Sequence, residues 1–519
     1  MAKVIMIQGT MSGAGKSMLA AGLCRIFARK GLRTAPFKSQ NMALNSYITR
    51  DGLEMGRAQV MQAEAAGLEP DVRMNPVLLK PTSDTGSQVI VGGKVRADMD
   101  ARAYFRYKKE LIPEILDAYR SLSRENDIIV VEGAGSPAEI NLKSDDIVNM
   151  GLAKMIGSPV LVVGDIDRGG VFAQLAGTWL LLEQEERRYV KGLVINKFRG
   201  DKSILDPGVA MLKKYTPVTT VGVIPYVDLD LDDEDSLSGR LEQNRAQDGK
   251  LDIAVIRLPH LSNFTDFNAL SRSGQAAVRY IRFASELGHP DLLILPGSKN
   301  TMGDLRWMRK EGLEEAVVKA ARSGLPVLGI CGGYQMLGRS IQDPAGVEDG
   351  GEIAGLGLLP VETVFAGSKR RTRAGGRVCS LSGTWKALSG TEFEGYEIHM
   401  GRSRILTEHG SAADPQAQNQ PVSFSDLKLL QDRQTHADGC QTGNVCGTYV
   451  HGLFDNAAMQ KALLSMLLER KGRQAPAQAR FMDNKDWKNR QYDILADTIA
   501  ANMNMDMVFE IIDRGMDTI

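Results

Sequence analysis

Residues 9–17 have the composition needed to hold the phosphates of a nucleotide. This segment, GTMSGAGKS, follows an apolar run and precedes a helical pattern. In that context loop amides and the N-terminus of a helix converge on a phosphate. Lys16 would neutralise the β- and γ-phosphates, and Ser17 would offer its hydroxyl to Mg²⁺. We predict an ATP-binding loop that consists of Gly9, Thr10, Ser12, Gly13, Ala14, Gly15, Lys16 and Ser17.

The spacing of this loop departs from the common pattern at one position. The pattern GxxxxGK[ST] would place its first glycine at position 10, where this chain carries Thr10, and Gly9 comes one residue early. Gly13 and Gly15 still allow the close backbone approach that a phosphate needs. A glycine-rich turn that binds no nucleotide is the alternative.

Two carboxylates could complete a Mg²⁺ site beside Ser17. Glu132 ends the apolar run 128–131, and Asp165 ends the apolar run 159–163 after one glycine. Ligands of open α/β sheets gather at the carboxyl ends of the strands, and Mg²⁺ prefers an octahedral shell of oxygens. We predict Ser17 and Glu132 as the metal ligands, with Asp165 as a further or alternative ligand. A carboxylate that caps a strand end is the other interpretation of Glu132.

Cys331 is a candidate nucleophile. It lies in the segment Gly-Ile-Cys-Gly-Gly, between an apolar strand pattern and a helical pattern. Gly329 and Gly333 allow a tight turn that would expose the thiol at the start of a helix, where the thiolate is favoured. The chain has five cysteines and no CxxC pair, which argues against a disulfide framework or a zinc cluster. A buried structural cysteine is the alternative.

A thiolate that attacks an amide needs a base that later protonates the departing ammonia. His451 follows a short apolar strand pattern in the segment 447–455, and His399 is the rival candidate. Gly297 follows another strand pattern, so its amide or that of Ser298 could join the amide of Gly332 in stabilising an oxyanion. We predict Cys331 and His451 as catalytic residues and Gly297 and Gly332 as oxyanion residues.

The elements that must position these residues read as two α/β domains. Short apolar runs alternate with helical patterns in both halves of the chain, which predicts parallel sheets with crossover helices. The runs are 4–7, 128–131, 160–163, 193–195 and 221–224 in the first half, and 253–258, 292–295, 327–330 and 445–450 in the second. We predict an ATP-binding domain over 1–230, a linker over 231–250, an amidase domain over 251–460 and a helical tail over 461–519.

Composition excludes several classes of function. The 519 residues include 63 basic and 63 acidic side chains, so no net charge attracts nucleic acid or an anionic membrane. The apolar runs are far shorter than the ~18 residues that span a membrane. Residues 1–10 lack the pattern of a signal peptide. We therefore expect a cytoplasmic protein without a nucleic-acid or membrane partner.

The motifs resemble known families. The loop with Gly9 and Lys16 is similar to that of dethiobiotin synthetase and the MinD-type ATPases. Segments 36–47 and 80–88 resemble signatures of the cobyric acid synthase family. Residues 251–460 resemble the class I glutamine amidotransferase domain, in the branch that cobyric acid synthases share with cobyrinic acid a,c-diamide synthases.

The amidotransferase resemblance has one departure from the wider class. Most class I members carry a glutamate two residues after the catalytic histidine, where this chain has Leu453. A leucine cannot accept a hydrogen bond from the imidazole. We therefore expect a dyad of Cys331 and His451, oriented by a backbone carbonyl or by Glu397, and slow hydrolysis of glutamine.

The resemblance implies an ATP- and glutamine-dependent amidation of a corrinoid. The b, d, e and g carboxylates of adenosylcobyrinic acid a,c-diamide would be activated as acyl phosphates and amidated to give adenosylcobyric acid. A homo-oligomer is possible. By the same resemblance Lys38, Asn41 and Lys80 would hold the substrate or the transferred phosphate, and Asn45 could donate a hydrogen bond there. Asn196 could contact the adenine, and a surface turn is almost as good an interpretation.

Three alternatives remain open at this point. A cobyrinic acid a,c-diamide synthase has the same two modules. A MinD-like ATPase switch could carry an inactive amidotransferase module, but such switches usually end in a basic amphipathic helix, and the tail here contains several Asp and Glu residues. A glutaminase with a regulatory nucleotide site would also carry both motifs.

Overall fold

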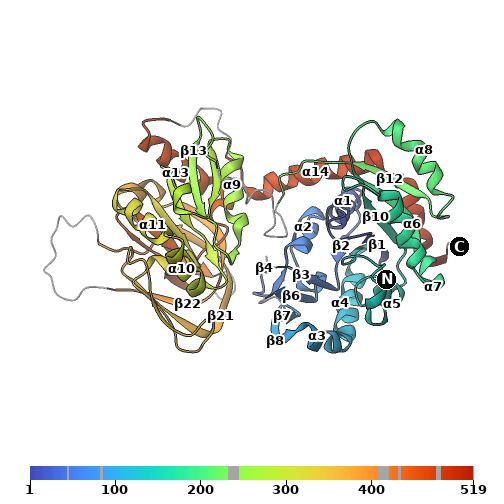
Figure 1. Cartoon of the computed structure of the whole chain (residues 1–519), viewed down its shortest axis with the longest axis horizontal. Coiled ribbons are helices and arrows are strands. Elements are labelled where there is room, and N and C mark those ends of the chain that lie inside the picture. The colour runs from blue at the N-terminus through green and yellow to red at the C-terminus, as the bar shows by residue number, and fades with distance from the viewer. Residues whose placement is uncertain are drawn as a thin grey trace. The chain divides into compact units, whose positions relative to one another are not determined.

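The computed structural model describes residues 1–43, 46–81, 86–231, 245–406, 420–429, 434–474 and 481–517. The chain forms two compact units (Figure 1). The first contains Met1–Thr49, Leu53–Glu234 and Lys488–Ile519, and the second contains Arg50–Gly52 and Asp235–Trp487. Most of the linker predicted over 231–250 lies outside the described residues. The boundaries proposed from the sequence therefore stay a prediction.

The first unit is built on a six-stranded parallel sheet with the strand order β12-β11-β10-β1-β9-β2. All six residues of β10 are buried, as expected of a strand covered on both faces. The strands are β1 (Lys3–Gly9), β2 (Thr34–Phe37), β9 (Ile128–Glu132), β10 (Val160–Asp165), β11 (Val190–Phe198) and β12 (Thr220–Pro225).

Helices cover both faces of this sheet. Ile5 and Ile7 of β1 pack in one buried cluster with α1, α14 and α15, and Met6 packs in another with α4, α5 and α6. This alternation follows from the two-residue period of a strand. The helices of the unit are α1 (Lys16–Arg29), α2 (Arg57–Ala65), α3 (Ala101–Tyr107), α4 (Ile112–Glu125), α5 (Met150–Ile156), α6 (Val171–Leu181), α7 (Gln184–Arg187), α8 (Lys202–Leu212), α14 (Asn484–Asn502) and α15 (Met505–Arg514).

An insertion between β2 and β9 carries two of the predicted substrate residues, Asn41 and Lys80. It forms a four-stranded sheet with the order β3-β6-β7-β8 and a two-stranded sheet of β4 and β5. Its strands are β3 (Gln40–Met42), β4 (Ser46–Ile48), β5 (Glu54–Gly56), β6 (Val77–Pro81), β7 (Gly86–Val91) and β8 (Lys94–Asp100). Lys38 precedes this insertion, Asn41 lies on β3 and Lys80 lies on β6.

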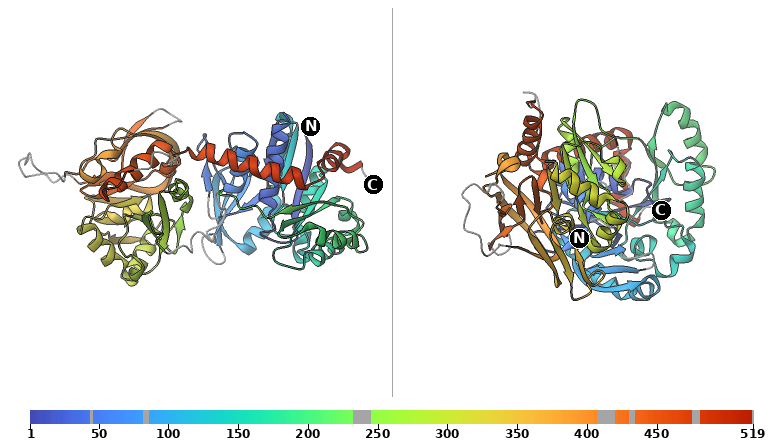
Figure 2. Two further views of the ribbon diagram at one scale, coloured as in Figure 1. Left: turned by 90° about the horizontal axis from the view of Figure 1, so that it is seen from above. Right: turned by 60° about the vertical axis from the view of Figure 1, so that its left-hand side comes forward.

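The C-terminal helices belong to the first unit from Lys488 onward. Ile499 of α14 packs so closely on α1 that a Cβ at Gly22 would lie 2.2 Å from its Cδ1 atom. On the same side Arg25 of α1 pairs with Asp493 at 2.9 Å. Figure 2 shows these helices in red. The chain therefore completes its first unit only after the second unit has been built.

The second unit contains a six-stranded sheet with the order β15-β13-β16-β18-β26-β25, parallel except for β25. A further sheet, β20-β19-β21-β23-β24, carries β22 as a partner of β21. The strands of these sheets are β13 (Leu251–Ile256), β15 (Ala276–Ile281), β16 (Leu292–Leu295), β18 (Val327–Ile330), β19 (Ser340–Asp343), β20 (Gly351–Ala354), β21 (Val361–Val378), β22 (Glu392–Ile405), β23 (Ser425–Leu429), β24 (Thr435–Asp438), β25 (Cys440–Thr442) and β26 (Val445–Thr448).

The remaining elements of the second unit are short. A pair of two-residue strands, β14 (Leu261–Ser262) and β17 (Gly297–Ser298), forms its own ladder. The helices are α9 (Asn268–Arg272), α10 (Thr301–Lys310), α11 (Leu313–Arg322), α12 (Gly332–Leu337) and α13 (Ala457–Arg470). A low-complexity stretch, residues 411–421, lies almost wholly outside the described residues.

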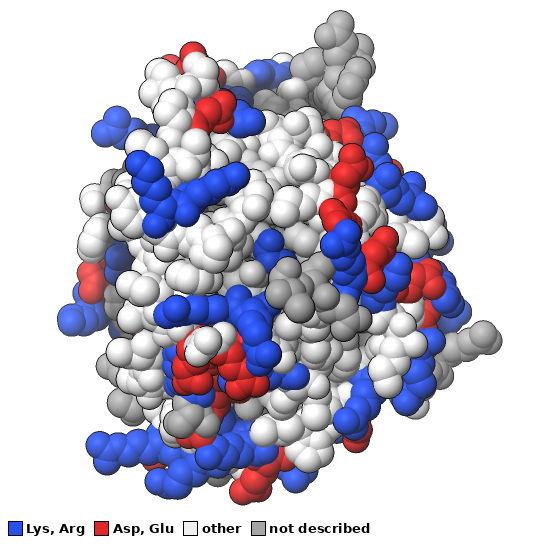
Figure 3. Space-filling model, turned by 90° about the vertical axis from the view of Figure 1, so that its right-hand side faces the viewer, with Lys and Arg blue, Asp and Glu red and all other residues white. Residues whose placement is uncertain are grey.

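The surface carries charges of both signs. On the face that Figure 3 shows, Lys and Arg side chains lie interspersed with Asp and Glu side chains. This agrees with the equal numbers of basic and acidic residues, 63 each. No helix of the described chain has the length and apolar character that crossing a membrane requires.

Candidate active sites

The predicted phosphate loop connects β1 to α1 and closes around the Lys16 ammonium group. Gly13 and Gly15 have φ angles of 75° and 94°, which only glycine adopts without strain. Lys16 Nζ donates hydrogen bonds of 3.0 Å to the carbonyls of Met11 and Gly135. The side chain of Lys16 is buried. A cation therefore lies inside the loop, where an anionic phosphate would be bound.

Ser17 and Glu132 meet beside this loop. Ser17 Oγ donates to Glu132 Oε1 at 2.8 Å, and Lys38 Nζ reaches the same oxygen at 2.9 Å. Burial works to raise the pKa of Glu132, but the charge of Lys38 and hydrogen bonds from Lys38, Gln62 and Ser17 outweigh it and hold the pKa below its usual value. The carboxylate is therefore ionised.

These oxygens fit a magnesium ion that also binds a nucleotide. A hydroxyl and a carboxylate are hard oxygen donors of the kind that Mg²⁺ prefers. Within the described ranges, no three His, Cys, Asp or Glu side chains gather into a metal cluster. A magnesium ion held by Ser17 and Glu132 would therefore need its other oxygens from phosphates and water. Asp165, the alternative ligand, bonds instead to Lys197 at 2.7 Å.

The predicted substrate residues have different partners. Lys38 lies at Glu132, whereas Lys80 Nζ forms a buried ion pair with Glu54 and donates to Ser46 Oγ. Asn41 is buried against Gly56, where a Cβ would lie 2.5 Å from its Nδ2 atom. Asn45 lies outside the described residues.

Cys331 occupies a strained turn between β18 and α12. Its φ and ψ are 52° and −109°, a conformation that a non-glycine residue rarely adopts. The neighbouring glycines permit this turn, because a Cβ at Gly333 would lie 1.9 Å from the carbonyl oxygen of Leu295. The thiol donates to the carbonyl of Ile398 at 3.7 Å. The local pattern of a nucleophile at a sharp strand-to-helix turn is therefore present.

His451 is oriented by a carboxylate that the sequence analysis missed. His451 Nδ1 lies 2.7 Å from Asp266 Oδ2, and the Gly452 amide donates to Asp266 Oδ1 at 3.1 Å. Both side chains are buried. Burial of the ring works to lower the pKa of His451, but the charges of Asp266 and Cys331 outweigh it and raise the pKa to about 10. The ring therefore favours the imidazolium form beside the thiol.

The expectation that Glu397 or a backbone carbonyl orients His451 is wrong. Tyr396 stacks on the His451 ring with centroids 5.3 Å apart. Consecutive side chains of a strand point to opposite faces, so Glu397 points away from that ring. It instead lies 3.4 Å from both His399 and His436. The rival histidine, His399, donates from Nδ1 to the Gly401 carbonyl and stacks on Tyr449, so it has a different environment.

The predicted oxyanion residues lie next to the nucleophile and the histidine. A Cβ at Gly332 would lie 2.9 Å from the amide nitrogen of Ser298. A Cβ at Gly297 would lie 3.1 Å from His451 Cε1. The turn after β16, the first residue of α12 and the imidazole therefore converge on one place in the second unit.

The two halves of the chain match two domain families. Residues 5–237 match the CobQ/CobB/MinD/ParA nucleotide binding domain, and residues 252–459 match the CobB/CobQ-like glutamine amidotransferase domain. The whole chain is also similar to curated cobyric acid synthases. It is 56% identical to that of Ruminiclostridium cellulolyticum, with 100% of this chain and 98% of the relative covered. The chain belongs to the cobyric acid synthase family.

The chain has similar sequence identities to other members of this family. The cobyric acid synthase of Lachnoclostridium phytofermentans is 54% identical, with 99% of this chain and 100% of the relative covered. That of Citrobacter koseri is 50% identical, with 99% of both chains covered. These matches confirm the predicted family, the two-domain α/β fold class and the class of enzyme, an ATP-dependent glutamine amidotransferase ligase.

The sequence of this chain gives only a weak indication that Asp266 is a functional residue. It lies in a segment between two buried phenylalanines, Phe264 and Phe267, shortly after the first strand of its sheet. A carboxylate between apolar residues that are buried must itself find a polar partner. The sequence separation from His451 is 185 residues, so spacing alone could not name that partner.

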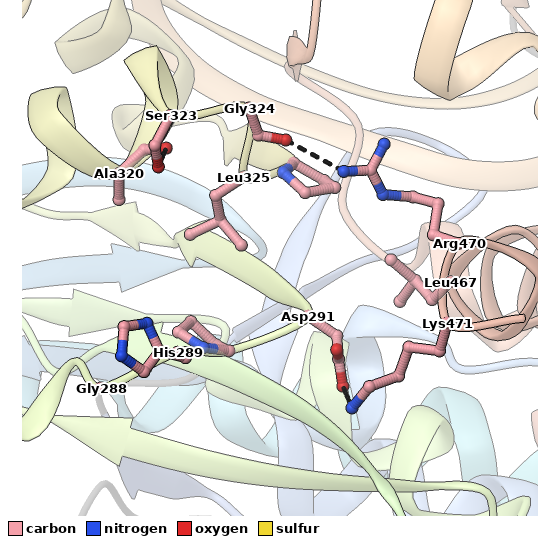
Figure 4. A pocket seen from close by; sticks show the side chains of 12 residues that line it. Gly288, His289, Asp291, Ala320, Ser323, Gly324, Leu325, Leu467, Arg470 and Lys471 are labelled. Carbon is pink, nitrogen blue, oxygen red and sulfur yellow. Dashed lines mark hydrogen bonds and ion pairs between the residues drawn. The ribbon is translucent and has the colours of Figure 1, made fainter.

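A separate cavity of about 310 Å³ lies at the opposite end of the parallel sheet in the second unit (Figure 4). Its lining includes Asp291 and Pro326, which directly precede β16 and β18, whereas Cys331 follows β18. Its two cations are already paired. Lys471 bonds to Asp291 at 2.9 Å, and Arg470 donates to the Gly324 carbonyl at 3.0 Å. We assign no catalytic role to this cavity.

Proposed function

We propose that this chain uses ATP and glutamine to amidate the b, d, e and g carboxylates of adenosylcobyrinic acid a,c-diamide, which gives adenosylcobyric acid. The observation that carries the proposal is the presence of two complete sets of reactive groups on one chain. Ser17 and Glu132 lie at a phosphate loop, and Cys331, His451 and Asp266 form a thiol site. Membership of the cobyric acid synthase family supports the choice of substrate.

The thiol site would release ammonia from glutamine. The Cys331 thiolate attacks the side-chain amide carbon, and the amides of Gly332 and of Gly297 or Ser298 stabilise the resulting oxyanion. His451 then donates its proton to the departing ammonia, and a glutamyl thioester remains. Water hydrolyses the thioester to glutamate. Asp266 holds the Nδ1 proton, so that Nε2 is the nitrogen that exchanges protons with the thiol and the substrate.

The phosphate-loop site would activate the carboxylate that ammonia attacks. A corrinoid carboxylate oxygen attacks the γ-phosphorus of ATP, the bond to the β-phosphate oxygen breaks, and an acyl phosphate and ADP form. Lys16 neutralises charge on the transferred group. Mg²⁺, when held by Ser17 and Glu132, would neutralise further charge on the phosphates. Ammonia then attacks the acyl carbon, and phosphate leaves.

Lys38 and Asn41 are the candidates for contact with the carboxylate or the transferred phosphate. The position of Lys38 supports this role, because its ammonium group lies at Glu132, beside the phosphate loop. Lys80 has less support, because Glu54 and Ser46 already bind its ammonium group. If Glu132 and Ser17 held a divalent cation, that cation would neutralise Glu132, and the ammonium group of Lys38 could bind a substrate anion.

Mass spectrometry of the corrinoid tests the reaction. The protein would be incubated with adenosylcobyrinic acid a,c-diamide, Mg²⁺, ATP and glutamine, and the corrinoid mass followed over time. We expect four successive mass decreases, each for one carboxyl OH that becomes NH₂, and none without ATP. An unchanged corrinoid, with ATP and glutamine still hydrolysed, would contradict the proposed substrate and keep the two half-reactions.

A further inference from the structure

Backbone strain marks one residue of the first unit. Among the residues that the structure describes, three non-glycine residues have positive φ angles: Lys197, Asn263 and Cys331. Cys331 is the candidate nucleophile, and the carbonyl of Asn263 accepts from the amide of Asp266, the partner of His451. Strained residues of this kind persist where surrounding contacts require them and cluster at functional sites. Lys197, with a φ of 61°, is the remaining one.

Lys197 also lies in an irregular part of β11. Ile195 pairs with Val223 of β12 and Phe198 pairs with Pro225, so two residues of β11 oppose one residue of β12. Such a bulge re-aims side chains, and glycine is the usual residue where it needs a positive φ. A lysine at a position with such strain points to a requirement for its side chain.

The Lys197 side chain reaches the phosphate loop. Its Nζ donates to the carbonyl of Gly13 at 2.7 Å and to Asp165 Oδ2 at 2.7 Å. The preceding residue also binds the loop: Asn196 Nδ2 donates to the carbonyl of Ala14 at 3.0 Å. Two consecutive residues at the end of β11 therefore bind two consecutive carbonyls of the loop.

These two bonds act on the loop amides. In a trans peptide the carbonyl of one residue points opposite to the N–H of the next. Carbonyls of Gly13 and Ala14 that are held toward β11 therefore turn the N–H groups of Ala14 and Gly15 to the other side. Amides presented together in this way form the cradle that binds phosphate oxygens. The bonds would fix that cradle before a nucleotide arrives.

The same ammonium group balances a buried carboxylate. The Asp165 side chain is 1% exposed and has Lys197 as its close cation, with the exposed Arg168 at 3.8 Å. Without Lys197, a buried negative charge would lie at the loop with only that weaker partner and would repel the phosphates of a nucleotide. We propose that Lys197 is a positioning residue for ATP, which holds the phosphate-loop carbonyls and neutralises Asp165. This inference rests on the proposed function, because it takes ATP as the bound nucleotide.

Direct nucleotide binding tests this role. Mg²⁺ and ATP would be titrated by calorimetry into the full chain and into Lys197→Met, with Lys202→Met as the matched control for loss of an exposed lysine five residues on. We expect Lys197→Met to raise the Kd for ATP by about 10- to 100-fold, the effect of losing one charged hydrogen bond. Lys202→Met should leave the Kd unchanged. ATP affinity within twofold of the unmutated protein in Lys197→Met would overturn the proposal.

A second variant separates positioning from folding. Lys197→Met alone leaves the Asp165 carboxylate without its close cation, so we expect it to lower the Tm of the nucleotide-free protein. Adding Asp165→Asn removes that carboxylate and should restore the Tm. The double variant should still bind ATP more weakly than the unmutated protein, because the bond to the Gly13 carbonyl is missing. Full recovery of affinity would contradict the part assigned to the Gly13 carbonyl. Failure of the unmutated protein to bind ATP would contradict the proposed function instead.

Discussion

At the scale of single residues, the thiol site depends on charge that has been removed from water. His451 and Asp266 are both buried and 2.7 Å apart. Removing either partner of such a buried ion pair is costly, because the other partner is left as an uncompensated buried charge. The carboxylate of Asp266 thus does two things for His451: it selects the tautomer of the neutral ring and, together with the charge of Cys331, it raises the pKa to about 10.

The variant Asp266→Asn should lower the kcat for glutamine hydrolysis by about 10²- to 10⁴-fold, because an amide can stabilise the wrong tautomer of the ring. The charge of Asp266 raises the pKa of His451, so its removal lowers that pKa. Activity needs the imidazolium as the acid for ammonia. The alkaline limb of the pH profile should therefore move to lower pH, which steady-state assays of glutamate release would measure.

Glu397→Gln is the matched control for that variant. It makes the same chemical change at a buried carboxylate whose contacts are His399 and His436. We expect the alkaline limb of this control to keep the position found for the unmutated protein. An Asp266→Asn enzyme with an unshifted limb would refute the role assigned to Asp266.

At the scale of elements, α14 is the piece that completes the first unit. Its buried residues Tyr492, Leu495 and Ile499 belong to the same cluster as α1 and β1. Gly22 gives this contact its closeness, because any side chain there would collide with Ile499. Without α14, the apolar residues of α1 that it covers would be exposed to water. That exposure has a free-energy cost in proportion to the apolar area.

Ile499→Ala should destabilise the first unit by about 2–5 kcal/mol, the range for deleting a buried aliphatic side chain. Ile494→Ala, on the same helix, makes the same change at a side chain that is 49% exposed, whereas Ile499 is 1% exposed. We expect the control to change stability by less than about 0.5 kcal/mol. Urea denaturation followed by circular dichroism would measure both. Equal effects would show that α14 does not pack as described.

At the scale of the whole molecule, the proposed reaction is divided between two sites. The first unit contains the match to a nucleotide binding domain, and the second contains the match to a glutamine amidotransferase domain. The groups of the phosphate loop do not include the nucleophile Cys331, and the groups of the thiol site do not include the loop cation Lys16. Each half-reaction should therefore be removable without the other, provided that the nitrogen source can be supplied from solution.

Cys331→Ala should abolish amidation with glutamine but keep amidation with a high concentration of ammonium chloride, because free ammonia replaces the product of the thiol site. Lys16→Ala should abolish amidation from either source, since no acyl phosphate forms. Amide formation would be followed by mass spectrometry of the corrinoid. Loss of the ammonia-dependent reaction in Cys331→Ala would mean that Cys331 does more than release ammonia.

Features that depend on the spacing of neighbouring residues could be predicted from the chain before its structure. The glycines around Lys16 and Cys331 can serve only tight turns at those places, so both motifs were recognisable without a structure, and the alternating apolar runs predicted both parallel sheets. Tertiary structure alone decided which distant side chains meet. Asp266 reaches His451 across 185 residues, Glu54 binds Lys80, and Lys197 reaches Gly13 across 184 residues. Local patterns report backbone geometry, whereas such pairs are chosen by packing and by the cost of leaving a buried charge without a partner.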